Sequence, residues 1–248
     1  MSFPDVVLLF GVGVVSAFLN VMAGGGSALA LPVLIFMGLD SALANGTNRV
    51  AILIQNIFAV TSFRSLDVHE FRKSLSLTLW ALPGAVGGAV VGVTISDTWF
   101  QRILAVVMIA TVVTLLFPQQ SVAEDPAISK KRERLIYPIM VGIGFYGGFI
   151  QVSVGFLFMA ALYHVMRMNL VRVNMHKVTI VMIYMVPALA VYAWTGNVDW
   201  LRGLSLGAGS AVGGWWAARV SVRGGEKAIR IVLVAAILVM SAKLLGLF

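Results

Sequence analysis

The stretch Ala23-Gly24-Gly25-Gly26-Ser27 lies between two apolar segments, Phe18-Leu19-Asn20 before it and Leu31-Pro32 after it. Both flanks are apolar enough to enter a lipid bilayer. Three consecutive glycines, however, each cost roughly 1 kcal/mol relative to alanine inside a helix. The stretch therefore predicts a helix break, and a break at membrane depth must be buried in protein or line a cavity. Close packing between helices is the alternative role for these glycines.

The composition is typical of a polytopic helical membrane protein. Of 248 residues, 60% are hydrophobic and only 11% are charged, whereas about 25% are charged in soluble domains. The net charge of +8 is spread between apolar runs, which indicates membrane topology signals rather than a nucleic-acid surface. The absence of cysteine excludes disulfides and cysteine-ligated metals. The first ten residues lack the basic region of a cleavable signal peptide, so we expect the first apolar run to stay in the mature fold.

Apolar runs of about 20 residues can each cross a bilayer as a helix. We expect all-α spans at 42–63, 74–95, 99–117, 171–194, 200–218 and 228–247, and broken helices at 4–38 and 135–166. The polar segment 119–134 is expected to be a solvated linker between the two halves.

The two halves resemble each other at three places in the same order. Phe18-Leu19-Asn20-Val21 matches Phe149-Ile150-Gln151-Val152, segment 45–49 aligns with 174–177, and Ala85-Val86-Gly87-Gly88 returns as Ala211-Val212-Gly213-Gly214. These matches predict an internal repeat, with 1–118 and 135–248 each built from a broken helix followed by three spans.

The positions of Lys and Arg predict the topology. Most lie at 64–73, in the linker 119–134 and at 219–230, which should face the cytoplasm, whereas 96–102 and 195–202 hold one each and should face outside. Each broken helix then enters and leaves on one side, either as a re-entrant hairpin or as two unequal helices packed together. Because each half crosses the membrane three times, an odd number, the two repeats have opposite orientations in the membrane. Inverted repeats of this kind recur in transporters.

Carboxylates are absent from the centres of the predicted spans. All ten lie in loops, in the linker or at membrane edges: Asp5, Asp40, Asp67, Glu70, Asp97, Glu124, Asp125, Glu133, Asp199 and Glu226. Cation and proton pathways usually use intramembrane Asp or Glu. The pattern argues against a metal-ion carrier, a carboxylate proton relay and a carboxylate-based intramembrane hydrolase, and we expect no metal or cofactor.

The polar residues within the spans are neutral or basic and recur at helical spacing. One predicted stripe includes Asn45, Asn48 and Arg49, and the other includes Asn174 and Lys177. Arg49 and Lys177 each lie about two turns into a span, so snorkelling to the interface is one alternative. The other is an anion site, in which the two cations neutralise charge and amide or hydroxyl groups donate hydrogen bonds.

The predicted binding residues form two groups, one from each half. The first group is Asn20, Gly25, Gly26, Ser27, Thr47, Asn48 and Arg49, and the second is Gln151, Ser153, Asn174, His176 and Lys177. Helix N-termini at Gly26-Ser27 and near Gly155 would add positive dipoles. For His176, an interfacial or hydrogen-bonded structural histidine is the alternative.

With these residues in hand, the chain resembles the TauE/SafE family of membrane permeases, also called the sulfite exporter family. The resemblance rests on the glycine-rich break running to Pro32 and on the turn Ala44-Asn45-Gly46-Thr47-Asn48. The second half departs from that pattern, with Ser153-Val154-Gly155-Phe156 at its break. The resemblance implies transport of small sulfur-containing anions, such as sulfite or organosulfonates, across the bacterial inner membrane.

Several alternatives stay open from the sequence. A channel for small anions and a permease for carboxylates or other sulfur anions fit the same residues. An integral-membrane enzyme is the alternative from another class, although no Ser/His/Asp or metal cluster falls within the spans. The expected partners are a small anionic substrate and the lipid bilayer, without nucleic acid, and a homodimer is also an open alternative.

Overall fold

The structure, a computed structural model, describes the backbone of residues 1–116 and 130–244; side chains are described there except at 108, 111–116, 130–133, 230 and 233–244. The described residues confirm the all-α prediction, and they contain no strand. In chain order the elements are α1 (Phe3–Ala23), α2 (Ser27–Phe36), α3 (Ser41–Arg64), α4 (Phe71–Thr94), α5 (Asp97–Leu116), α6 (Lys130–Phe149), α7 (Val154–Ala160), the π-helical turn η1 (Ala161–Val165), α8 (Leu170–Trp194) and α9 (Trp200–Leu244).

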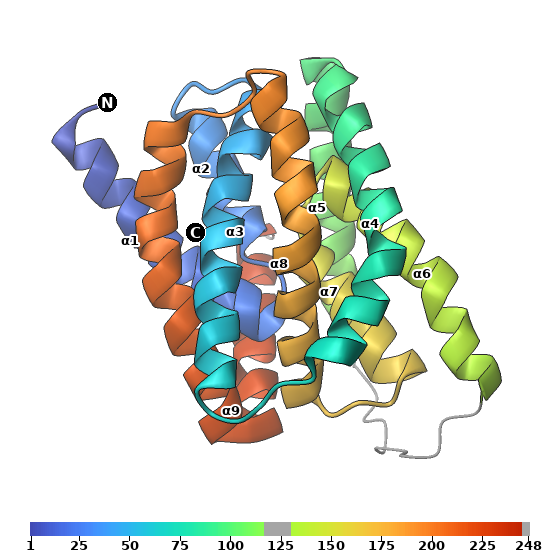
Figure 1. The fold of residues 1–248 in the computed structure, drawn as a ribbon. Helices are drawn as coiled ribbons and strands as arrows, with labels where there is room; N and C mark the ends of the chain where they lie inside the picture. The colour runs from blue at the N-terminus through green and yellow to red at the C-terminus, as the bar shows by residue number, and fades with distance from the viewer. Residues whose placement is uncertain (117–129, 245–248) are drawn as a thin grey trace.

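The first break turns the chain back on itself. Helix α1 runs alongside the first part of α9 in the same direction, because Phe10 is next to Gly209 and Phe18 stacks near Trp216. Helix α2 then returns toward the end at which α1 began, where a short loop leads into α3 (Figure 1). The α1–α2 pair is therefore a hairpin whose tip lies inside the bundle.

A second hairpin enters from the opposite end of the bundle. Helix α6 runs parallel to α4, since Trp80 stacks near Tyr137 and Gly88 packs against Phe145. After the break at 150–153, α7 and η1 lead back to the end where α8 begins (Figure 1). The tips of the two hairpins thus approach each other from opposite ends.

Glycines allow both hairpins to pack closely against neighbouring helices. An added Cβ at Gly84 would lie 2.1 Å from the Val141 carbonyl oxygen of α6, and one at Gly213 would lie 2.2 Å from the Val14 carbonyl oxygen of α1. Contacts this close need a residue without a side chain, as is common between membrane helices.

By length and composition, three of the described helices could cross a membrane: α1, α4 and α8. Helix α3 is not among them because it carries a polar face. That face is buried rather than exposed to lipid, as shown by Asn45, Asn48, Arg49, Gln55 and Asn56, each at most 3% exposed. The low mean hydropathy of α3 therefore follows from residues that it turns toward the centre of the bundle.

Two predicted boundaries differ from the structure. The chain is helical from 200 to 244, and the loop expected at 219–230 is reduced to a single non-helical residue, Gly225, with φ 58° and ψ −157°. A left-handed φ costs glycine little, so one residue suffices to redirect the helix. The expected linker is also shorter, because α6 already begins at Lys130. Residues 117–129 and 245–248, which include most of the predicted linker 119–134 and the end of the predicted span 228–247, lie outside the described residues.

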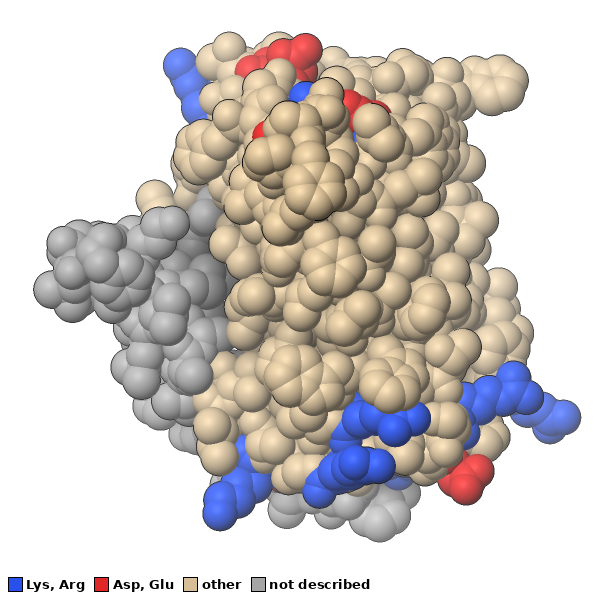
Figure 2. Space-filling model, turned by 90° about the vertical axis from the view of Figure 1, so that its left-hand side faces the viewer, with Lys and Arg blue, Asp and Glu red and all other residues tan. Residues whose placement is uncertain are grey.

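Basic side chains gather at one end of the molecule. Figure 2 shows Lys and Arg concentrated at the end drawn at the bottom, separated by a broad uncharged band from the other end, where most of the visible acidic residues lie. The exposed residues of the basic end include Arg64, Arg72, Arg134, Arg223 and Lys227. The uncharged band carries the exposed apolar side chains expected of a surface in contact with lipid.

Candidate functional site

The tips of the two hairpins touch through their backbones. A Cβ placed on Gly24 would lie 2.4 Å from the Gly155 carbonyl carbon, and a Cβ on Gly155 would lie 2.3 Å from the Gly24 Cα. Gly24 is also left-handed, with φ 89°, and its N–H donates to the carbonyls of Leu19 and Asn20. Glycine is required at this contact by the lack of space and, at Gly24, by the backbone conformation as well.

The second break reaches its conformation without a left-handed glycine. Gln151 and Ser153 have φ values of 62° and 60°, which cost roughly 1–2 kcal/mol for each residue that carries a Cβ. The Tyr146 hydroxyl donates to the Val152 carbonyl oxygen at 2.5 Å and holds the segment between them. The two breaks are therefore chemically different, as the sequence comparison of the halves predicts.

A small cavity lies where the two hairpin tips meet α3 and α8. Its volume is about 10 Å³, roughly enough for one water molecule. The lining residues are Asn20, Gln55, Asn56, Gln151, Val154, Gly155, Lys177 and Val181. Lys177 is the one charged residue among them, and no carboxylate of the described residues lines the cavity.

Lys177 holds the C-terminal end of α1. Its ammonium donates to the carbonyl oxygens of Asn20 at 3.1 Å and Val21 at 2.7 Å, and to Asn174 Oδ1 at 2.8 Å. Three acceptors match the three N–H groups of a charged ammonium. The last carbonyls of a helix carry partial negative charge, so the positive charge of Lys177 stabilises the end of α1 while facing the cavity.

Arg49 makes the equivalent contact with the other hairpin. Its guanidinium donates to the carbonyl oxygens of Gly147 at 3.2 Å and Gly148 at 2.5 Å, at the end of α6, and lies over the Tyr192 ring at 4.4 Å from the centroid. Arg49 is fully buried, so it does not snorkel to the membrane surface. It is also not among the cavity-lining residues, although it was predicted to line one side of the site opposite Lys177.

Two glutamines on the cavity wall accept hydrogen bonds from other side chains through their amide oxygens. Gln55 Oε1 accepts from Asn20 Nδ2 at 3.3 Å, and Gln151 Oε1 accepts from the Tyr184 hydroxyl at 3.1 Å. In both cases another side chain already donates a hydrogen bond to the amide oxygen. The NH₂ group of each glutamine is therefore directed toward other acceptors. Asn56 instead donates to the Ile52 carbonyl of its own helix at 2.7 Å.

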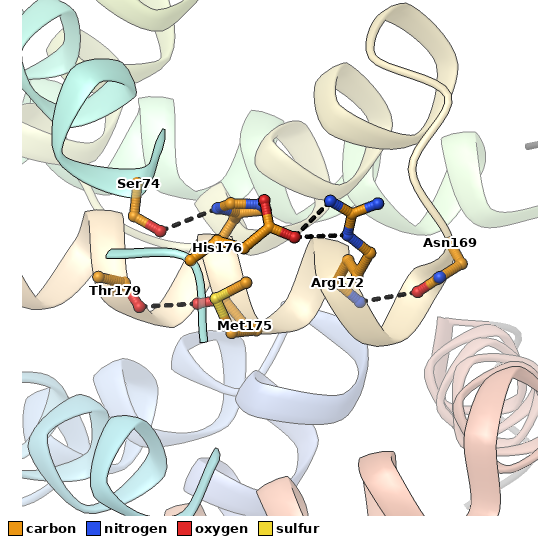
Figure 3. A network of polar contacts seen from close by, with 7 residues as sticks. Ser74, Asn169, Arg172, Met175, His176 and Thr179 are labelled. Atoms are coloured by element: carbon orange, nitrogen blue, oxygen red, sulfur yellow. Dashed lines mark hydrogen bonds and ion pairs between the residues drawn. The ribbon is translucent and has the colours of Figure 1, made fainter. Parts of the chain in front are cut away.

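His176 lies away from the cavity in a separate polar network. Its Nδ1 is 2.8 Å from Ser74 Oγ, and its Nε2 is 3.6 Å from Glu70 Oε2. Figure 3 shows this network, in which the carboxylate also accepts from Arg172. His176 was predicted to line the site with Lys177, but the structure does not bring it to the cavity wall, because adjacent residues of a helix point about 100° apart.

Glu70 joins α4 to α8 in this network. Burial raises the pKa of its carboxyl, but the hydrogen bond and positive charge of Arg172 outweigh this, and the net pKa lies below its ordinary value. The network connects the beginnings of two helices at the basic end of the bundle.

Three other predicted residues, Thr47, Asn174 and Gly26, make hydrogen bonds away from the cavity. Thr47 Oγ1 accepts from the Asp199 N–H at 2.9 Å, which fixes the entry to α9. Asn174 donates weakly to the Met22 carbonyl at 3.5 Å and accepts from Lys177. Gly26 accepts from Ser16 Oγ at 2.8 Å.

Four further predicted residues do not line the cavity. A Cβ on Gly25 would meet the Phe156 ring at 2.6 Å. Ser27 is buried at the start of α2. Asn48 Nδ2 and Ser153 Oγ are buried, and among the described residues neither has a hydrogen-bond partner.

Of the twelve predicted residues, the structure places Asn20, Gln151 and Lys177 on the cavity wall. The residues missed are Gln55, Asn56, Val154, Gly155 and Val181. The sequence places Asn56 on the same polar stripe as Asn45 and Asn48, with Gln55 beside it, so both could have been included in the predicted binding set. The lining combines one lysine and four amide side chains with no carboxylate of the described residues, a composition that suits a small anion better than a cation.

Comparisons with known proteins show the family to which the chain belongs. The chain is similar to a probable membrane transporter protein of Haemophilus influenzae, with 25% identity covering 96% of this chain and 93% of that protein. It is likewise similar to the probable membrane transporter proteins YfcA of Escherichia coli K12, with 25% identity over 96% of this chain and 88% of the relative, and YjnA of Bacillus subtilis, with 22% identity over 96% and 98%. No solved structure gives a significant match. The family model described as sulfite exporter TauE/SafE matches residues 9–244, nearly the whole chain, and the protein therefore belongs to the TauE/SafE family of membrane transporters.

Proposed function

We propose that this transporter carries small oxyanions across the bacterial inner membrane by alternating access, with sulfite and organosulfonates as the first candidates. The observation that carries the proposal is the cavity between the two hairpin tips. It presents the Lys177 ammonium and amide groups, and no described carboxylate lines it. The sulfur chemistry of the cargo rests on the description of the family.

The charge of the cavity favours an anion over a cation. A cation placed beside Lys177 would be repelled at short range in a medium of low dielectric constant, whereas an anion would be attracted. The NH₂ groups of Gln55 and Gln151 could donate to the oxygens of the anion, because the oxygen of each amide already accepts from another side chain.

The size of the cavity supports a carrier rather than an open channel. A volume of about 10 Å³ accommodates roughly one water molecule, which is smaller than any oxyanion with three or four oxygens. An anion can therefore enter only after the helices move. The structure fits an occluded conformation of a transporter whose site opens to one side at a time.

Two inverted repeats, 1–118 and 135–248, would supply that motion. Reciprocal contacts support this part of the proposal: Lys177 of the second half binds the end of α1, and Arg49 of the first half binds the end of α6. The pair Asn20–Gln55 likewise corresponds to the pair Gln151–Tyr184. Each hairpin would then be re-entrant in the membrane and would move with the half that holds its tip.

The basic end would face the cytoplasm, following the positive-inside rule. Helices α3, α4, α6 and α8 each have a terminus there, and the linker 119–134 would emerge at the same end. The α1–α2 hairpin would then enter from the periplasm and the α6–α7 hairpin from the cytoplasm.

Uptake by proteoliposomes tests the proposal. Purified protein is reconstituted, and uptake of labelled sulfite and of labelled organosulfonates is measured with and without excess unlabelled anion inside. We expect saturable uptake and counterflow, both reduced at least about tenfold in Gln151→Leu through loss of a buried hydrogen-bonding group. The control variant Gln101→Leu, on the exposed surface of α5, should transport as wild type does. Flux that never saturates would favour a channel, and absence of uptake for every small oxyanion would refute the proposal.

A further inference from the structure

The contacts that close the two ends of the bundle correspond to each other but differ in chemistry. We propose that His176 is a proton-binding site, and that binding of a proton there opens the basic end of the bundle. The proton comes from the water at that end, where Glu70 is partly exposed. The proposal rests on the proposed function, because it concerns one of the two ends that must open in turn, and it adds a second ligand to the transport cycle.

The first long span of each half is anchored in the same way, at opposite ends of the bundle. The Ser41 N–H at the start of α3 donates to Asp97 Oδ1 at 2.8 Å. The Leu170 N–H at the start of α8 donates to Glu226 Oε1 at 2.9 Å. In each pair the carboxylate follows its donor by 56 residues. These contacts support equivalent roles for α3 and α8, of which α8 begins at the basic end and α3 at the other (Figure 1).

The same register relates the contacts that close the two ends. Thr47 of α3 corresponds to His176 of α8, and Asp199, directly before α9, corresponds to Glu70, directly before α4. Thr47 Oγ1 accepts from the Asp199 N–H at 2.9 Å. At the basic end, His176 Nε2 lies 3.6 Å from Glu70 Oε2, and Nδ1 lies 2.8 Å from Ser74 Oγ (Figure 3). Each end is thus closed by a contact between the two halves, and the contact at the basic end contains a side chain that titrates near neutral pH.

The closed contact favours a neutral His176. Its imidazole is fully buried, and Nε2 has no hydrogen-bond partner among the described residues, because 3.6 Å is too long for a hydrogen bond. Glu70 accepts instead from Arg172. The charged groups that act on the ring are Glu70 and Lys73 from the α4 side and Arg172 from α8, so two cations face one anion. An imidazolium here would be buried without a hydrogen-bonded counter-charge, which is costly.

Opening of the basic end removes that cost. When the start of α4 separates from α8, the ring meets water, where an imidazole titrates near pH 6.5. A proton then binds the open conformation more tightly than the closed one, so the population shifts toward the open conformation as the pH falls. The neighbouring Lys177 holds the end of α1, so movement of this turn of α8 also reaches the hairpin tip beside the cavity.

A buried cysteine between α4 and α8 reports this opening without any cargo. The chain has no cysteine of its own. Thr78, fully buried on α4, lies one turn beyond Ser74 on the same face, and Ser65 is exposed at the basic end. The full-length variants Thr78→Cys and Ser65→Cys are purified, and their rates of reaction with a small thiol reagent are measured from about pH 7.5 to about pH 5.5. The ratio of the two rates is followed, because acid slows the reaction of every thiol.

We expect the ratio to rise about tenfold over this range, as follows from an open-state imidazole that titrates near pH 6.5. The rise should disappear in His176→Gln and persist in His69→Gln and His164→Gln, which replace the two exposed histidines of the chain. Glu70→Gln keeps the imidazole and should keep the rise.

Three results would overturn the proposal: a ratio that stays constant with His176 present, a rise that persists in His176→Gln, or a rise that is lost in Glu70→Gln, which would assign the response to the carboxylate. Each of these leaves oxyanion transport intact, because no anion takes part in the labelling. An intact acid response in a protein that takes up no small oxyanion would refute the proposed function instead.

Discussion

The Cα atom of Gly24 lies only 2.3 Å from the position that a Cβ on Gly155 would occupy. The two hairpin tips therefore meet backbone to backbone. This contact joins parts of the chain that are far apart in sequence and that enter the bundle from opposite ends. It sets the distance between the tips and hence the size of the cavity beside them.

Replacing Gly155 with alanine should therefore destabilise the protein. Overpacking of a tight contact typically costs about 1–3 kcal/mol, and here the added Cβ meets backbone that has no side chain to rotate away. We expect a lower thermal midpoint in detergent and a loss of transport. Gly142→Ala in α6 is the matched control, because nothing lies within 4 Å of its added Cβ; a midpoint of Gly155→Ala equal to that of this control would contradict the contact.

Arg49→Lys tests whether Arg49 stabilises the fold rather than binding the cargo. Lysine keeps the charge but loses the planar fork that donates to Gly147 and Gly148. Charge-assisted hydrogen bonds contribute about 1.5–3 kcal/mol each, so we expect a clear drop in thermal midpoint, with the affinity for the best anion unchanged. Arg102→Lys, at an exposed position, should change neither quantity. A selective loss of anion affinity at unchanged stability would place Arg49 in the binding site.

The contact between Glu70 and Arg172 should make stability depend on pH. The pKa of Glu70 in the folded protein lies below its ordinary value near 4.5. Its contribution is therefore present above the unfolded pKa and is lost as the pH falls through the folded pKa. In a double-mutant cycle of Glu70→Gln and Arg172→Gln, we expect a coupling of up to about 1 kcal/mol at pH 7, since both side chains are partly exposed. The coupling should vanish below the folded pKa of Glu70; a coupling that grows on acidification would have the wrong sign.

Ser153→Gly should stabilise the second break. Ser153 is left-handed at φ 60°, and its buried hydroxyl has no partner among the described residues. Glycine removes the left-handed strain, which costs roughly 1–2 kcal/mol, together with the unpaired hydroxyl. We expect a higher thermal midpoint, and the helical control Ser205→Gly should lower it by about 1 kcal/mol. A lower midpoint for Ser153→Gly would mean that the hydroxyl has a partner that this conformation does not show.

Much of the fold could be predicted from local sequence. Three glycines cannot continue a helix cheaply, and the structure ends α1 at Ala23 and begins α2 at Ser27. Spans were predicted from apolar runs, and α4 and α8 lie within a few residues of those predictions. The spans predicted at 200–218 and from 228 onward lie on the two sides of the kink at Gly225 in α9. The shortness of this connection was not predicted, because one glycine with a positive φ replaces a loop that the basic residues around it suggested.

The site was harder to predict because charge alone does not show what a cation binds. Lys177 and Arg49 occupy similar positions in two polar stripes, yet only Lys177 reaches the cavity wall. The difference depends on which helix end lies within reach of each side chain, which is a property of tertiary packing. His176 illustrates the same limit, since its partners Ser74 and Glu70 come from a helix start roughly 100 residues away in sequence.

Substrate protection of a cysteine in the cavity wall tests the central claim most directly. The chain has no cysteine of its own, so Val181→Cys places a single thiol among the lining residues, and Ser76→Cys, exposed on α4, serves as the control. Each variant is reconstituted, and its rate of reaction with a small thiol reagent is measured with increasing concentrations of the transported anion. We expect the anion to slow labelling at position 181, with a midpoint equal to its apparent affinity for transport, and to leave labelling at position 76 unchanged. Labelling at 181 that stays the same at saturating anion would contradict a binding site between the two helix breaks.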